Sequence, residues 1–108
     1  MEIHKEILAT FPGLSVAEGI LGPLSIQETT PPLKALNDEI VRSIRERYTL
    51  ERIKDEPLFR AYRDFFWKVG VDPTRTRPAS EALVRRILSG KVLPTINTAV
   101  DAYNLASV

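Results

Sequence analysis

Three short polar side chains near the end of the 108-residue sequence have a spacing that could build a polar site. Asn97, Asp101 and Asn104 stand at positions i, i+4 and i+7, so a helix would place them on one stripe. Asn and Asp are poor helix formers, and a buried amide must find a hydrogen-bond partner. A helix that keeps three such groups in line either braces neighbouring backbone or lines a polar pocket.

The same helix has a second, apolar stripe. Ile96, Val100 and Tyr103 are each offset by one residue from the polar side chains, which is about 100° around a helix axis. We therefore predict a helix over residues 95–106 that buries these three side chains. The two amides and the carboxylate would then lie at the edge of the buried face.

Positive charge gathers just before this helix, whereas residues 1–30 have a net charge of −3. Residues 75–91 have a net charge of +4, from the single acid Glu81 and the bases Arg75, Arg77, Arg85, Arg86 and Lys91. Guanidinium groups pair with phosphates in a two-pronged geometry, and a helix N-terminus also attracts anions. The four arginines are candidate contacts to a nucleic-acid backbone. The alternative is a solvated face in which Arg77 or Arg85 pairs with Glu81 or Asp101.

Two further features each have a functional and a structural interpretation. Glu81 is either a general base or a favourable charge in the first turn of a helix. Phe65, Phe66 and Trp67 are adjacent in the sequence and cannot all share one helix face. They either anchor the core or provide a platform on which nucleic-acid bases stack.

The composition excludes several classes of site. The chain has no cysteine and one histidine, His4, which argues against a disulfide framework, a cysteine zinc site and a histidine-based triad. No phosphate-binding loop or dinucleotide fingerprint is present, so we expect no metal and no cofactor. No apolar run approaches the length of a membrane span, and the N-terminus does not resemble a signal peptide. We expect a cytoplasmic protein that does not enter membranes.

The periodicity of apolar residues predicts an α+β, helix-rich fold in one domain, residues 1–108. Leu14 and Val16 alternate with polar residues, as do Leu24 and Ile26, and this pattern predicts short strands within residues 7–27. Spacing typical of helices, bounded by proline and glycine, predicts helices over 32–47, 56–69, 78–89 and 95–106. A short helical segment is also expected after Thr49. The strands would pack against the helices.

Two segments of the sequence resemble the B3/B4 domain family in residue types, order and spacing. They are Tyr62–Leu83 (YRDFFWKVGVDPTRTRPASEAL) and Leu93–Asn104 (LPTINTAVDAYN). This domain belongs to the beta subunit of phenylalanyl-tRNA synthetase and also occurs in free-standing proteins, to which the similarity is best. In the synthetase it is an editing module, which hydrolyses the ester of tRNA wrongly charged with tyrosine.

The resemblance implies roles for individual residues. The last asparagine of the family motif helps to line the editing pocket, and that role would fall on Asn104. Asp101 and Asn97 match motif positions with a supporting role. Family members continue with further strands, whereas this chain ends at Val108. The resemblance therefore implies the N-terminal part of a longer domain, inactive by itself, which a missing C-terminal half, a second chain or self-association would complete.

Three functions remain open at this stage. The first is a free-standing editing domain, which binds tRNA or aminoacyl-tRNA and hydrolyses mischarged tRNA as an ester hydrolase. The second is a non-catalytic module that binds a small molecule without tRNA. The third is a packing segment for a partner chain. The positive charge of residues 75–91 favours the first, and the small net charge of the whole chain, +1, favours the second.

Overall fold

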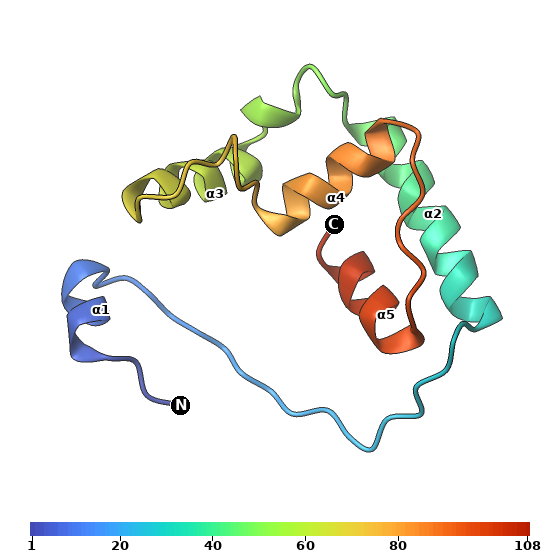
Figure 1. The fold of residues 1–108 in the computed structure, drawn as a ribbon, viewed down its shortest axis with the longest axis horizontal. Coiled ribbons are helices and arrows are strands. Elements are labelled where there is room, and N and C mark those ends of the chain that lie inside the picture. The colour runs from blue at the N-terminus through green and yellow to red at the C-terminus, as the bar shows by residue number, and fades with distance from the viewer.

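The structure, a computed structural model, describes residues 1–108, and all its regular elements are helices. In chain order they are α1 (Lys5–Thr10), α2 (Pro31–Arg47), the 3-10 helix η1 (Ile53–Asp55), α3 (Pro57–Lys68), α4 (Ala79–Leu88) and α5 (Thr98–Ala106). Both α4 and α5 contact α2, while η1 contacts α3 (Figure 1). A long arc of chain connects α1 to α2 around the outside of these elements.

Prolines and glycines set the ends of the predicted helices. Pro31 and Pro57 occupy first-turn positions of α2 and α3, where the missing N–H of proline costs no hydrogen bond. Gly70 and Gly90 follow α3 and α4 with φ of 79° and 80°, the left-handed region that favours glycine. The N–H of Val71 then donates to the carbonyl of Phe66 at 2.9 Å, which completes the capping motif of α3. The four long helices are confirmed.

The predicted strands are wrong, because the structure contains no strand and is not α+β. Residues 12–30 form an open arc, and no backbone N–H or carbonyl of residues 15–26 makes a hydrogen bond within the chain. The alternation at Leu14, Val16, Leu24 and Ile26 is typical of a strand with one buried face. A ladder also requires a neighbouring strand, however, and none is present for this segment to pair with. The short helix α1 was not predicted.

The core is small and excludes the N-terminal part of the chain. Its buried apolar side chains are Ile44, Ile53, Phe59, Val84, Ile87, Leu93 and Leu105. They come from α2, η1, α3, α4, the α4–α5 connection and α5. The radius of gyration is 16.5 Å, whereas a compact domain of this length has about 13 Å. Few residues thus hold the helices together, and much apolar surface remains exposed.

Ile87 lies at the centre of this core, so its truncation should be costly. Its side chain is 0% exposed, and we expect Ile87→Ala to lower the free energy of unfolding by about 2–5 kcal/mol. The control is Val92→Ala, which removes methyl groups from a side chain that is 78% exposed. This variant should change the free energy of unfolding by less than about 0.5 kcal/mol. Urea unfolding followed by circular dichroism measures both. Equal effects of the two variants would contradict the proposed core.

Candidate functional site

A cavity of about 580 Å³ lies between α2 and residues 91–105. One wall is the polar face of α2, and the other is the α4–α5 connection with α5. The side chains that can bind a ligand by charge or hydrogen bond are Thr29, Lys34, Asn37, Asp38, Arg45, Lys91, Thr95, Asp101 and Asn104. The cavity therefore brings together residues that are about 60 positions apart in the sequence, around a lining that carries both signs of charge.

Two of the three polar residues predicted in α5 brace the start of that helix. Asn97 precedes α5 as its N-cap, and its Oδ1 accepts a hydrogen bond from the N–H of Val100 at 2.9 Å. Oδ1 of Asp101 accepts one from the N–H of Ile96 at 3.0 Å. Asp101 also lines the cavity, and Asn97 does not. Asn97 thus satisfies a first-turn donor that an uncapped helix would leave without a partner, and Asp101 fixes the residue that precedes the cap.

Asn104 is the residue of this set whose side chain remains available. It is half-buried, lines the cavity, and makes no side-chain hydrogen bond to another residue of the chain. Its amide offers two N–H donors and one carbonyl acceptor. The residue singled out by the family resemblance thus faces the cavity with its hydrogen-bonding capacity unused.

The predicted apolar stripe of α5 is wrong in two of its three residues. Ile96 is 55% exposed and Tyr103 is 63% exposed, whereas Leu105 is buried. The helix begins at Thr98 rather than Thr95, so Ile96 lies outside it and is not part of a helical stripe. The strong capping residue Asn97 sets this later start.

A pair of hydrogen bonds connects the start of α5 to the segment before α2. The N–H of Thr98 donates to the carbonyl of Gln27 at 2.8 Å, and the N–H of Gln27 donates to Oγ1 of Thr98 at 3.0 Å. Thr29 lines the cavity two residues after Gln27, so this pair fixes the segment that leads to the α2 wall against the start of the helix in the other wall.

Glu81 has a structural role, as the centre of a cluster of three charged residues. Its side chain is 0% exposed, and Nη2 of Arg63 and Nε of Arg85 lie 2.7 Å and 2.9 Å from its Oε1. Nε of Arg63 also donates to Oε2 at 2.9 Å. Burial would raise the pKa of Glu81, but the hydrogen bonds and charges of Arg63 and Arg85 outweigh it and leave the pKa below its ordinary value.

This cluster decides between the two interpretations of Arg85 that the sequence leaves open. It also contains Arg63, which the sequence analysis does not single out. Arg85 pairs with Glu81 one helical turn away, as the structural interpretation allowed. Arg63 lies 18 residues earlier, in α3, and its hydrogen bonds to Glu81 raise its own pKa. No local sequence signal joins residues at that separation. A carboxylate fixed by two guanidinium groups is a poor candidate for a general base.

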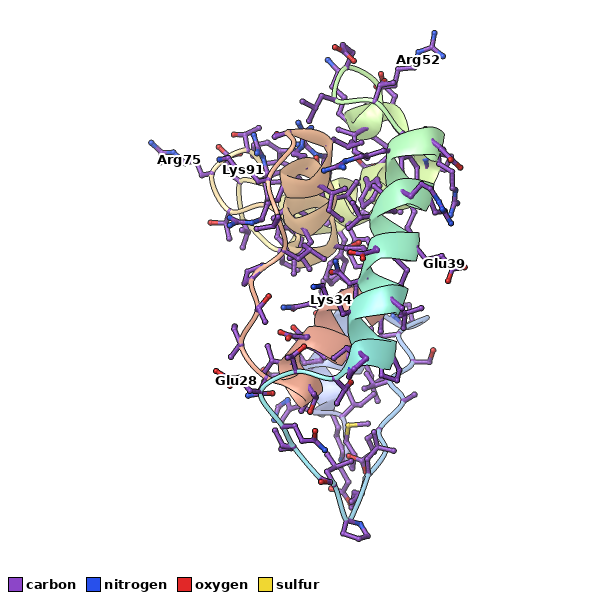
Figure 2. All side chains as sticks on the ribbon, turned by 90° about the vertical axis from the view of Figure 1, so that its right-hand side faces the viewer. Glu28, Lys34, Glu39, Arg52, Arg75 and Lys91 are labelled. Carbon is purple, nitrogen blue, oxygen red and sulfur yellow. The ribbon has the colours of Figure 1, made fainter.

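The four arginines predicted to bind RNA occupy two different environments. Arg75 and Arg77 are exposed and form no ion pair or side-chain hydrogen bond. Arg85 is held by Glu81, and Nε of Arg86 donates to the carbonyl of Val92 at 2.6 Å. Figure 2 shows Arg75 pointing away from the molecule on the side of the view where Lys91 lies, and Figure 1 shows that α4 separates the connection before it from the connection after it. Two of the four guanidinium groups are thus free to meet a ligand.

The loop that presents Arg75 has an ordered start. Oδ1 of Asp72 accepts hydrogen bonds from Oγ1 of Thr74 at 2.6 Å and from its N–H at 2.9 Å. These bonds lower the pKa of Asp72, the side-chain bond most strongly. A loop closed in this way holds the following arginines at the protein surface.

The three adjacent aromatic residues of α3 point in different directions. Phe65 packs against Phe11 with ring centroids 5.5 Å apart, which connects α1 to α3. Phe66 is half-buried, and Trp67 is 58% exposed. Phe65 and Phe66 thus have packing roles, and Trp67 remains open to solvent.

The comparison with known families covers α4 and α5 completely, together with residues 61–68 of α3. Residues 61–108 match the B3/4 domain family. The match confirms the resemblance over this segment to the B3/B4 domain of the phenylalanyl-tRNA synthetase beta subunit, a domain related to tRNA synthetases. No curated protein and no solved structure matches the chain. The α2 wall of the cavity lies outside the matched segment.

One further property concerns membranes. None of the helices combines the length with the apolar character that crossing a bilayer requires.

Among substitutions that remove a single charge, we expect those in the Glu81 cluster to lower the free energy of unfolding most. We expect Glu81→Gln to lower the free energy of unfolding by about 3 kcal/mol, because it leaves two partly buried guanidinium groups without a counter-charge. The control is Asp64→Asn, which removes the exposed Arg60–Asp64 pair at 3.8 Å and should cost less than about 1 kcal/mol. Urea unfolding at neutral pH measures both variants.

The free energies of unfolding of the wild type and Glu81→Gln, compared across pH, test whether the charge of Glu81 is the cause of the difference. A carboxyl whose folded pKa is depressed contributes stability above its unfolded pKa and loses it as the pH falls through the folded value. The ordinary pKa of Glu81 is 4.5, so the difference between wild type and Glu81→Gln should be constant above that pH and shrink below it. A difference that stays constant down to about pH 2 would contradict an ionised Glu81.

Proposed function

We propose that this chain is a tRNA-linked editing module, which binds the aminoacyl end of a tRNA in the cavity between α2 and α5. The observation that carries the proposal is the position of Asn104, half-buried in this cavity with no partner for its amide. The match of residues 61–108 to the B3/4 domain supports a tRNA-related ligand. The volume of about 580 Å³ falls within the range of small-molecule sites.

The charges of the cavity suit the groups of an aminoacyl ester. Its protonated amine would pair with a carboxylate, either Asp38 or the second oxygen of Asp101, whose Oδ1 is already used by Ile96. The amide of Asn104 would donate to the ester carbonyl. Lys91, which lines the cavity, and the exposed Arg75 in the loop before α4 would meet the phosphates of the acceptor end.

Hydrolysis at such a site needs no nucleophile from the protein. A bound water would attack the ester carbonyl carbon, the bond from that carbon to the ribose oxygen would break, and the departing ribose oxygen would take up a proton from the water, which leaves the free amino acid and a ribose hydroxyl. The N–H of the Asn104 amide would stabilise the negative charge that develops on the carbonyl oxygen. The fully engaged Glu81 takes no part in this scheme.

A second candidate function is binding of a small zwitterion without tRNA. The cavity offers Lys34, Arg45 and Lys91 beside Asp38 and Asp101, which suits a molecule that carries both an amine and an acid. The low net charge of the chain, +1, also favours this candidate. The two functions differ in whether phosphate contacts contribute to binding.

A salt series separates these two functions. Affinity for tRNA, measured by fluorescence polarisation, should fall steeply as salt rises, because phosphate contacts release counterions. In Arg75→Ala/Lys91→Ala, which removes the two proposed phosphate contacts, the slope of log affinity against log salt should be smaller by about 1.5. The matched control is Arg60→Ala, an exposed arginine of α3 paired with Asp64, which should leave the slope unchanged. A flat response in the wild type would exclude tRNA and leave the small-molecule function.

Asn104 provides the test of chemistry. We expect Asn104→Ala to slow deacylation of mischarged tRNA by about 10²–10³-fold, the usual cost of losing an oxyanion donor, with the urea midpoint unchanged. The control is the neighbouring Tyr103→Ala, since Tyr103 is 63% exposed and does not line the cavity. Loss of stability together with activity in Asn104→Ala would instead assign Asn104 a bracing role.

A further inference from the structure

Residues 12–27, which we call the arm, expose apolar side chains and unpaired backbone together. Ile20 is 99% exposed and Leu21 is 83% exposed, and Val16, Leu24 and Ile26 are each at least 50% exposed. No backbone group of residues 15–26 makes a hydrogen bond within the chain. A contiguous stretch of this kind is typical of a segment that packs against another surface.

A groove of about 440 Å³ has the complementary character. It lies between α3, the start of α4 and the end of α5, and most of its lining is apolar: Tyr48, Leu58, Tyr62, Phe66, Val84 and Val108. No residue of the arm lines it. Leu58 and Tyr62 are 62% and 47% exposed, so the groove remains open for an apolar segment.

The charges of the arm and of the residues beside the groove are also complementary. Glu18 lies within the arm and Glu28 follows it, and residues 1–30 have a net charge of −3. Glu18 is 66% exposed, and its only ion pair is with the amino group of Met1. Arg77 immediately precedes Pro78, which lines the groove, and Arg75 and Arg77 are exposed without a partner. An acidic apolar segment therefore fits an apolar groove with a basic rim.

The arm of the same molecule is held away from this groove. At one end the ring of Phe11 packs on Phe65, with centroids 5.5 Å apart, and at the other end Gln27 and Thr98 exchange two hydrogen bonds. Between these attachments the arm follows the periphery of the molecule (Figure 1). To reach its own groove, the arm would have to break one attachment, whereas the groove of another molecule is accessible without this cost.

We propose that the arm of one copy docks into the groove of a second copy, reciprocally, in a two-fold symmetric dimer. The symmetry gives two identical arm–groove contacts, so both exposed surfaces of each copy are covered and the assembly closes. Residues 15–26 of the arm, when extended, span about 40 Å, and the two-fold symmetry doubles the apolar surface that one such contact covers.

A charge exchange tests the pairing without any RNA. In sedimentation velocity, the wild type should be dimeric at micromolar concentration. Arg75→Glu/Arg77→Glu and Glu18→Arg/Glu28→Arg should each be monomeric, because both contacts of each homodimer then join like charges. An equimolar mixture of the two variants should recover a dimer of one copy of each. The proposal is overturned if the wild type is monomeric, or if the mixture stays monomeric while the wild type is dimeric.

A second pair of variants tests the apolar contact. Ile20→Gln should weaken dimerisation at least tenfold, and because Ile20 is 99% exposed, the monomer should keep its circular dichroism spectrum. The matched control is Leu36→Gln, on an exposed part of α2 outside the groove and the arm, which should leave dimerisation unchanged. Equal effects of the two variants would show that the dimer forms through a different surface.

Discussion

The buried carboxylate of Glu81 is the interaction on which the arrangement of the helices depends. It receives Arg63 from α3 and Arg85 from α4, so one side chain fixes the relative position of two helices. The apolar core is too small to do this by packing alone, since α3 contributes a single buried residue, Phe59. Ionic contacts are directional, and a bidentate guanidinium fixes angle as well as distance. The groove between α3 and α4 owes its shape to this cluster.

The motif in α5 combines two functions that sequence spacing alone could not separate. Asn97 and Asp101 cap the backbone at the helix start, while Asn104, two turns later, faces the cavity. The capping bonds fix where α5 begins, and that starting point determines which way Asn104 points. Asn97 and Asp101 thus help to position Asn104, whose side chain remains available for a ligand.

Local signals made the helices predictable, and nonlocal pairing explains most of what was missed. Pro31, Gly70 and Gly90 act within one or two turns of their own position, so the ends of α2, α3 and α4 could be read from the sequence. The strands could not be judged in this way, because alternation at Leu14 and Val16 carries no information on whether a partner strand exists. The Arg63–Glu81 pair and the α2 wall of the cavity also depend on how distant segments meet. The late start of α5 is different, since the capping preference of Asn97 was a local signal that the stripe pattern concealed.

The exchange of hydrogen bonds between Gln27 and Thr98 places the outer part of the chain in register with the first residue of α5. Thr98 is adjacent to Asn97 and lies one turn before Asp101, so a displacement of Gln27 would pass directly into the capping bonds of the helix. The position of the N-terminal segment and the shape of the polar cavity are therefore thermodynamically linked through two hydrogen bonds. Because such linkage is reciprocal, a ligand that tightens the cavity would also restrict the segment that leads into it.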